Sequence, residues 1–393
     1  MTIHESLISP TANPELERAL RERLARRSAI AGGFGELEPL AVRLGLIQAS
    51  LTPKFQNPVL ALFAADHGLA VEGVGAQWGR STHDQAMLAL QGRLPCAVLA
   101  RLHGLQLQVI DCGIAEDLAP HPKLQLRKVA HGTRNSIFGP AMSRENLHAA
   151  LRVGMEIANT LRGNVLACAG MGMASNECAT LLLARLDSRL LRALLSPAAL
   201  PWIDLLEGVL NRHREALDAM DAMAAFGGYE IAVMAGAMLV AASKRMLILV
   251  DGLPACAALR CAASIAAPVM DYVMFCRSNR EPGLDAALHG FQAGTLLSLG
   301  MDSADGTGAT LAWPLVRSAA ALLSDVHEFP LQPAPVAGSS LPTEVPDQPA
   351  ADAEALCTEP SGFNQDTTVP ATATEALPLD ERSAYSSSAA PQG

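Results

Sequence analysis

The residues of this chain that could do chemistry lie in four short polar segments. They are residues 66–68, 170–176, 277–283 and 302–309; the first three directly follow apolar runs and the fourth opens a helical pattern. They combine carboxylate and imidazole groups, which can take up a proton, with glycine-rich turns, which let a backbone approach a ligand closely. Each segment is therefore a candidate part of a small-molecule site.

In the first segment, Asp66 and His67 close the apolar run VLALFAA. An Asp-His pair at this place can bind a substrate or orient a loop; alternatively, Asp66 caps a turn whose glycine adopts a positive φ. Farther along, Gln85 and Met87 can supply a polar and an apolar wall to a pocket. The alternative for that stretch is the start of a helix with Thr82 as its N-cap.

The second segment is a glycine-rich turn that contains Gly170 and Gly172. Ser175 and Asn176 then open a helix, and the N-terminus of a helix attracts phosphate or carboxylate groups. The alternative is that the glycines only allow the helix to pack tightly on the preceding strand.

The third segment is a loop that contains Arg277, Ser278, Arg280 and Glu281. Two guanidinium groups and a serine suit an anionic substrate. A surface loop joined by ion pairs is an equally good interpretation.

In the fourth segment, Asp305 directly precedes Gly306, Thr307 and Gly308. A carboxylate next to exposed backbone N–H groups can act as a general base beside a small ligand. The alternative is an ordinary N-cap and turn at the start of a helix.

The elements that must position these segments alternate between short apolar runs and helical patterns. We predict strands at residues 59–65, 105–111, 124–129, 164–168, 246–251 and 271–276, and helices at 15–27, 36–48, 82–103, 144–161, 175–195, 203–223, 228–242, 253–263 and 307–323. This alternation predicts an α/β fold, a three-layer, Rossmann-like and mainly parallel sheet flanked by helices, with a small helical subdomain from the N-terminal helices. Ligands of such sheets bind beyond the carboxyl ends of the strands.

Composition divides the chain into three parts. The net charge is −10, and residues 330–393 hold nine acidic residues and only one basic residue. Ten of the 25 prolines also lie there, so we expect a disordered acidic tail rich in Pro, Ala, Ser and Thr. The predicted organisation is an N-terminal helical segment at 1–50, an α/β domain at 51–329 and the tail at 330–393.

The sequence indicates no nucleic-acid partner, no membrane span and no signal peptide. It has no basic stripe, which argues against nucleic acid, and its most apolar window, 231–250, contains Ser243, Lys244 and Arg245, which argues against a membrane span. The eight cysteines form no C-x-x-C pair, so we expect buried thiols and no metal site. No signal peptide is indicated, and we expect a cytoplasmic protein.

The order of these motifs resembles the nicotinate-nucleotide–dimethylbenzimidazole phosphoribosyltransferase family. The matched segments lie at residues 65–87, 132–143, 227–237, 250–252, 277–283 and 304–309, and include ADHG, GTRN, GGYEIAVMAGA and DGTGA. They are collinear with the family pattern over about residues 15–325. The resemblance implies the family's fold, no cofactor and a homodimer in which the N-terminal helices make the contact.

This chain departs from the family pattern at several polar positions. Asp305 stands where the family has its catalytic glutamate, and Gly170 stands where the family has another glutamate. Ser175, Asn176 and Glu177 replace an Asn-Thr-Thr triplet. A Gly-x-Gly-Thr-Gly phosphate loop, expected near residues 194–203, is missing.

The family activity implied by the resemblance transfers phosphoribosyl from nicotinate mononucleotide to 5,6-dimethylbenzimidazole or a related azole, in assembly of the cobalamin nucleotide loop. The carried-over catalytic residue is Asp305. The carried-over substrate-binding residues are Asp66, His67, Gln85, Met87, Gly170, Gly172, Ser175, Asn176, Ser278, Glu281, Gly306, Thr307 and Gly308. The alternative is a catalytically impaired binding or regulatory paralogue, which the departures would explain.

Overall fold

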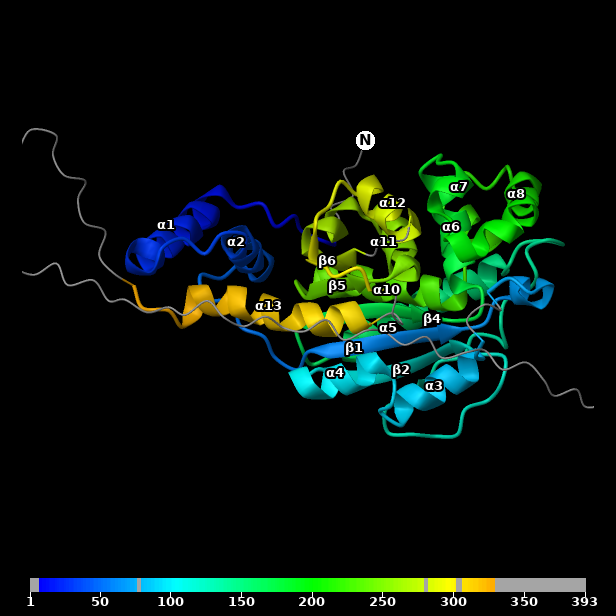
Figure 1. Cartoon of the computed structure of the whole chain (residues 1–393), viewed down its shortest axis with the longest axis horizontal. Coiled ribbons are helices and arrows are strands. Elements are labelled where there is room, and N and C mark those ends of the chain that lie inside the picture. Colours follow the sequence, from blue (N-terminus) through cyan, green and yellow to red (C-terminus); the bar gives the residue numbers. More distant parts are fainter. Residues whose placement is uncertain (1–6, 76–78, 279–281, 302–305, 329–393) are drawn as a thin grey trace, which may run out of the picture. The chain divides into compact units, whose positions relative to one another are not determined.

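The computed structural model describes residues 7–75, 79–278, 282–301 and 306–328. Its centre is one seven-stranded, all-parallel sheet with the order β3-β2-β1-β4-β5-β6-β7 (Figure 1). The strands are β1 (Val59–Ala65), β2 (Gln106–Gly113), β3 (Leu124–Leu126), β4 (Val165–Met171), β5 (Leu247–Asp251), β6 (Val273–Ser278) and β7 (Thr295–Ser298). The predicted α/β class and parallel sheet are confirmed.

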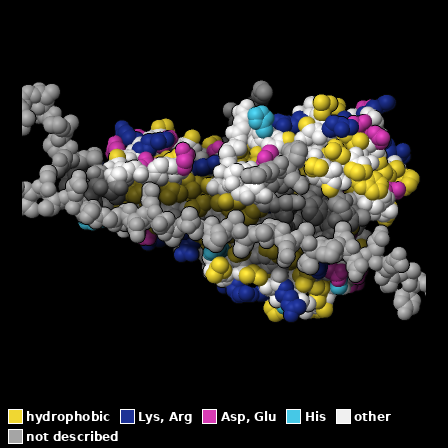
Figure 2. Space-filling model, viewed as in Figure 1, with side chains coloured by type: hydrophobic (Ala, Val, Ile, Leu, Met, Phe, Trp, Pro, Cys, Tyr) yellow, Lys and Arg dark blue, Asp and Glu magenta, His cyan; other side chains and the backbone are white. Residues whose placement is uncertain are grey.

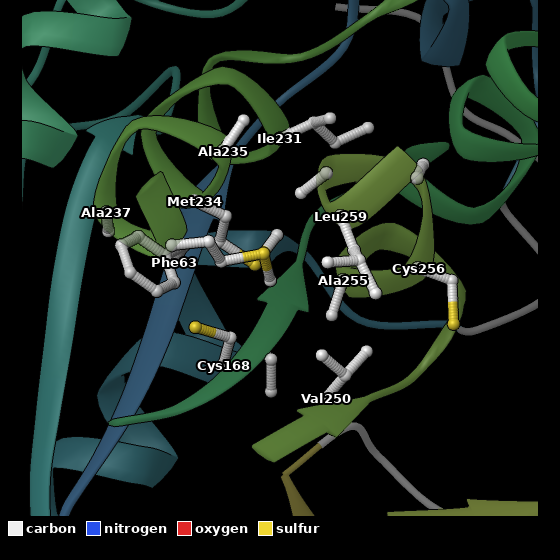
Figure 3. Packing of buried hydrophobic residues seen from close by; sticks show 14 of the residues in the cluster. Phe63, Cys168, Ile231, Met234, Ala235, Ala237, Val250, Ala255, Cys256 and Leu259 are labelled. Carbon is white, nitrogen blue, oxygen red and sulfur yellow. The ribbon is translucent and has the colours of Figure 1, made fainter. Parts of the chain in front are cut away.

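Helices cover both faces of this sheet. Helices α5, α10 and α11 pack on one face and α3, α4 and α13 on the other (Figure 1). Alternate residues of β1 show the two sides: Leu60 and Leu62 lie near the start of α13, whereas Phe63 lies against Met234 and Ala237 of α10 (Figure 3). All seven residues of β1 are buried, as expected for a central strand with helices on both faces.

The helical elements have the following bounds. They are α1 (Pro14–Ala31), α2 (Leu37–Gln48), α3 (Thr82–Leu90), α4 (Pro95–His103), α5 (Arg144–Thr160), α6 (Ser175–Leu186), α7 (Leu191–Leu194), α8 (Ile203–Arg212), α9 (Ala219–Phe226), α10 (Tyr229–Ser243), α11 (Leu253–Ile265), α12 (Pro282–Gly290) and α13 (Thr307–Ser324). Short 3₁₀ helices are η1 (Gly68–Glu72), η3 (Pro197–Trp202) and η4 (Ala267–Tyr272). None of the described helices is long and apolar enough to cross a membrane.

Three of the predicted helices are wrong in extent because turn residues divide them. The stretch 82–103 forms α3 and α4, since Gly92 adopts a positive φ of 73° and Pro95 starts a new helix. The stretches 175–195 and 203–223 are likewise divided into α6 and α7 and into α8 and α9. Helix α12 and the short strand β7 were not predicted.

The N-terminal helices α1 and α2 pack on each other and on α13. Asn13 caps α1 by accepting a hydrogen bond from the Leu16 N–H at 3.0 Å. Beyond α13, the Glu328 carboxylate contacts Arg23 at 2.6 Å and Arg27 at 3.2 Å. Basic and acidic side chains are interspersed over α1 on the face shown in Figure 2. The predicted tail, residues 330–393, lies outside the described residues.

Candidate functional site

A cavity of about 510 Å³ lies at the carboxyl ends of β4, β5 and β6. The strand order changes direction between β1 and β4, which are neighbours in the sheet. Residues that line the cavity lie in β4, in the turn into α6, in the turn after β5 and in the α7–η3 segment. Its position agrees with the location at which we expected the ligand.

The turn between β4 and α6 needs glycine because neighbouring atoms leave no room for a side chain. A Cβ atom on Gly172 would lie 2.0 Å from the Ala65 carbonyl oxygen, and one on Gly170 would lie 2.5 Å from the Pro254 Cβ. Both glycines line the cavity. The family's glutamate at the position of Gly170 would therefore not fit against Pro254.

Two predicted residues of α6 line the cavity directly. Ser175 is the first residue of the helix and Asn176 the second, and the next residue, Glu177, also faces the cavity although it is only 3% exposed. The prediction did not include Glu177. The available signal was an acidic residue in the first turn of a helix, directly after Ser175 and Asn176.

Behind Ser175 lies a fully buried polar cluster. The Ser175 Oγ is 2.7 Å from Glu230 Oε1, and the same oxygen is 2.8 Å from His67 Nε2. Burial opposes protonation of the imidazole, but the neighbouring Cys178 and Glu230 outweigh it and raise the pKa of His67 well above its ordinary value. His67 is therefore protonated, and Glu230 Oε1 is shared between its imidazolium and the Ser175 hydroxyl.

Asp66 joins three segments instead of facing the cavity. One of its oxygens accepts the Thr82 hydroxyl at the start of α3, and the other accepts the Ala115 N–H after β2 at 2.7 Å. The Thr82 oxygen in turn accepts the Met173 N–H at 3.0 Å. Asp66 and His67 thus fix the turns around the cavity, and neither lies among the residues that line it.

On α3, Gln85 lines the cavity and donates a hydrogen bond to the Arg80 carbonyl at 3.3 Å. Met87, the other predicted residue of this helix, packs against the hydrophobic core and does not line the cavity. Leu88 and Leu94 form an apolar wall beside Gln85. A flat aromatic base could pack against this wall.

The third predicted segment begins with a buried ion pair. Arg277 lines the cavity and its Nε donates to Asp251 Oδ1 at 2.7 Å, while Asp251 Oδ2 accepts the Ala309 N–H at 3.0 Å. Asp251 therefore caps α13 and holds Arg277 at once. Ser278 ends β6 and does not line the cavity; Glu281 lies outside the described residues.

The fourth segment is only partly described, and Asp305 lies outside the described residues. Gly306 adopts a φ of 90°, and a Cβ on Gly308 would lie 2.6 Å from both Asp251 and Arg277. Thr307, with its 4% exposure, is buried. These three residues do not line the cavity, but Gly308 lies against the ion pair between Asp251 and Arg277, of which Arg277 lines it.

The charges around the cavity are unequal. Among the described residues that line it, three are arginines (Arg80, Arg93 and Arg277) and one is a carboxylate, Glu177. The α7–η3 segment adds Leu194 and Leu195, both buried. An anionic ligand with an aromatic part would match this combination of guanidinium groups and apolar walls.

Comparison with known proteins agrees with this geometry. Residues 9–331 match the family model described as phosphoribosyltransferase. A nicotinate-nucleotide–dimethylbenzimidazole phosphoribosyltransferase of Cupriavidus taiwanensis is 38% identical over 332 residues, which is 81% of this chain and 95% of the relative. The protein with the same name from Chloroflexus aurantiacus is 34% identical over 322 residues, covering 79% of this chain and 92% of the relative.

A solved structure is similar as well. The crystal structure of the nicotinate-nucleotide–dimethylbenzimidazole phosphoribosyltransferase from Thermus thermophilus gives a TM-score of 0.74 at 29% identity, over 79% of this chain and 96% of that one. This chain thus belongs to the nicotinate-nucleotide–dimethylbenzimidazole phosphoribosyltransferase family.

Proposed function

We propose that this protein transfers phosphoribosyl from nicotinate mononucleotide to 5,6-dimethylbenzimidazole or a related azole, giving nicotinate and α-ribazole 5′-phosphate for cobalamin assembly. The observation that carries the proposal is the cavity at the carboxyl ends of β4, β5 and β6, which combines three arginines with apolar walls. The family membership supplies the reaction.

The chemistry needs one base. The bond from the ribose C1′ to the pyridinium nitrogen of nicotinate breaks, and its electron pair neutralises the pyridinium. A bond from C1′ to an azole nitrogen forms, and the azole loses its proton. We propose Asp305 as the acceptor of that proton, with Gln85 on the side of the azole and Met87 behind it in the core. Gly170, Gly172, Ser175 and Asn176 would lie on the side of the ribose phosphate.

The remaining predicted residues support this arrangement. We propose that Ser278 and Glu281, with Gly306, Thr307 and Gly308, belong to the segments that support the lining residue Arg277, because Gly308 lies against the Arg277 side chain. Asp66 and His67 would act by holding the turns in place, which is supported by their hydrogen bonds to Thr82 and Glu230.

Product formation tests the proposal. Purified protein is mixed with nicotinate mononucleotide and 5,6-dimethylbenzimidazole, and nicotinate and α-ribazole phosphate are measured by chromatography and mass spectrometry. We expect Asp305→Ala to lower kcat by about 10²–10⁴-fold, the usual contribution of a general base. Asp325→Ala, which removes an exposed carboxylate at the end of α13, is the matched control and should keep full activity.

A binding or regulatory paralogue is the second candidate. It is favoured by the α7–η3 segment, which puts Leu194 and Leu195 at the cavity in the part of the chain where the phosphate loop was expected. Such a protein would bind nicotinate mononucleotide without forming any product at high protein concentration. That result would contradict the enzyme proposal.

We also propose a homodimer and a cytoplasmic location. The homodimer, with contact through α1 and α2, rests on the family resemblance, and light scattering should give about twice the chain mass of 41.1 kDa. The location is supported by the seven cysteines in the described residues, which are buried and form no disulfide.

A further inference from the structure

The nucleotide of the proposed reaction brings a phosphate dianion into the cavity, and the cavity must supply a cationic partner for it. The α7–η3 segment, where a phosphate loop was expected, contributes Leu194, Leu195, Ser196 and Ala199 to the lining. None of these four described residues carries a positive charge. The partner of the phosphate therefore has to come from another wall of the cavity.

Arg277, one of the three arginines that line the cavity, already has its charge compensated. Its Nε donates to Asp251 Oδ1 at 2.7 Å, and its Nη1 donates to the Met301 carbonyl oxygen at 2.9 Å. The residue is 3% exposed. The ion pair with Asp251 is neutral as a whole, so Arg277 offers a phosphate little net attraction.

The other two arginines, Arg80 and Arg93, are exposed and lie beyond opposite ends of α3. Within the described part of the chain, neither guanidinium group has a hydrogen bond or an ion pair. A helix of nine residues is about 14 Å long, so the two side chains start from well-separated positions along the cavity. We therefore expect them to meet different parts of a ligand.

Arg80 lies beside the glycine turn that precedes α6. Two residues after it, the Thr82 hydroxyl oxygen accepts the Met173 N–H at 3.0 Å, and Met173 follows Gly172 in that turn. The Gln85 side-chain amide also donates to the Arg80 carbonyl oxygen at 3.3 Å. The start of α3 is therefore fixed against the turn beside which we place the ribose phosphate.

We infer that Arg80 binds the 5′-phosphate of the nucleotide and takes the place of the missing phosphate loop. This inference rests on the proposed function and specifies how its substrate is held. The planar guanidinium group can donate two parallel hydrogen bonds to two phosphate oxygens. The N-terminus of α6 has no side-chain cap, so the positive end of its dipole adds to the attraction.

The test compares nicotinate mononucleotide with nicotinate riboside, which lacks only the phosphate. Binding is measured as Kd by calorimetry without the azole, and turnover as kcat/KM with it. We expect Arg80→Gln to lower the preference for the mononucleotide by about 10–100-fold, the usual effect of a lost hydrogen bond to a charged group. The riboside should bind to the variant and to the wild type equally. Arg80→Lys should restore part of the preference, because lysine keeps the charge without the two-pronged geometry.

A second comparison separates the phosphate from the other anionic group of the substrate. Nicotinamide mononucleotide keeps the phosphate and has an amide in place of the nicotinate carboxylate. We expect Arg80→Gln to weaken its binding by the same factor as that of nicotinate mononucleotide. A loss confined to the nucleotide and the riboside of nicotinate would assign Arg80 to the carboxylate and overturn the inference.

Two charge-matched variants serve as controls. Arg93→Gln removes the same charge at the other end of α3, and Arg152→Gln removes one from the exposed surface of α5, outside the cavity lining. Because exposed charges about 14 Å apart are largely screened at physiological ionic strength, Arg93→Gln should keep the phosphate preference, as should Arg152→Gln. An equal loss of preference in Arg93→Gln would show that only the overall charge of the cavity matters, and would overturn the inference.

The remaining outcomes separate this inference from the proposed function. Because Arg80 is exposed, its variants should fold, and equal unfolding midpoints check this. A phosphate preference that Arg80→Gln leaves unchanged would overturn the inference, while product formed by the wild type would leave the proposed function standing. If the nucleotide binds with a preference that depends on Arg80 but no product forms, the proposed function fails and the inference stands. If no nucleotide binds, both fail.

Discussion

At the scale of single residues, the buried carboxylates of this protein are held by partners from distant parts of the chain. Glu230 meets His67 across 163 residues, and Asp251 meets Arg277 across 26. The sequence indicated that His67 closes a strand, and this is confirmed. It could not indicate that the ring faces inward to Glu230, because the side-chain direction depends on packing between two elements that are far apart in the sequence.

The His67–Glu230 pair should make stability depend on pH. His67 has a higher pKa in the folded protein than its ordinary value of 6.5. The stabilisation is therefore complete below that value and is lost as the pH rises through the folded pKa. We expect the difference in free energy of unfolding between wild type and His67→Gln to be larger at about pH 6 than at about pH 9.

Denaturant unfolding at both pH values checks this expectation. His148→Gln, a change on the exposed surface of α5, is the control and should show the same difference from wild type at both. A His67→Gln difference that grows with pH would contradict an imidazolium in the folded protein.

The turn before α6 allows a prediction about backbone contact. Gly172→Ala would place a Cβ 2.0 Å from the Ala65 oxygen, so the turn must move away from β1. We expect the free energy of unfolding to fall by roughly 2–4 kcal/mol and nucleotide binding to weaken. Gly208→Ala on the exposed side of α8 has no neighbour within 4 Å and should be stabilising by about 0.5–1 kcal/mol. Equal effects of the two changes would contradict the described contact.

At the scale of elements, Asp251 joins β5, β6 and α13. Its side chain is fully buried and holds both Arg277 and the N-terminus of α13. We expect Asp251→Ala to lower the free energy of unfolding by about 3–5 kcal/mol, because the buried guanidinium loses its carboxylate. Glu215→Ala removes one member of the exposed pair Arg214–Glu215 and should change stability little. Chemical denaturation compares the two, and a small effect at Asp251 would be against the prediction.

The elements that could be predicted are those with a strong local signal. Strand β1 was predicted with its observed bounds because all of its residues are apolar. Strand β7 was not predicted because its sequence, TLLS, is too short to form a continuous apolar run. The strand has four residues and lies at the edge of the sheet, where it is only partly buried. The predicted site segments around Gly170 and Gln85 do meet at one cavity, whereas Glu177 and the wall from Leu194 were missed because their place depends on how α6 and α7 pack.

At the scale of the whole molecule, the seven described cysteines are all buried in one hydrophobic core. Burial raises the pKa of the Cys261 thiol to about 12, and it also raises the pKa values of Cys112, Cys168 and Cys276. Since the thiolate is the reactive form, we expect these thiols to resist alkylation in the native protein. The variant Cys357→Ser removes the eighth cysteine, so that only the seven described cysteines can react.

Mass spectrometry after treatment with iodoacetamide at about pH 8, where an ordinary thiol is partly ionised, checks this expectation. No adduct should form on Cys112, Cys168, Cys261 and Cys276 in the native variant, and adducts on all seven cysteines should form in guanidinium chloride. Rapid labelling of a native thiol would show that part of the core opens easily.

The contact between Glu328 and the arginines of α1 has a consequence for how the protein is made. Arg27 and Glu328 are separated by 301 residues. A ribosome that adds roughly 5–20 residues per second needs about 15–60 seconds to make that stretch. During this time α1 is without the contacts that it makes with α13 and Glu328. These contacts can therefore form only late in synthesis, while the 65 residues that follow Glu328 are still being added.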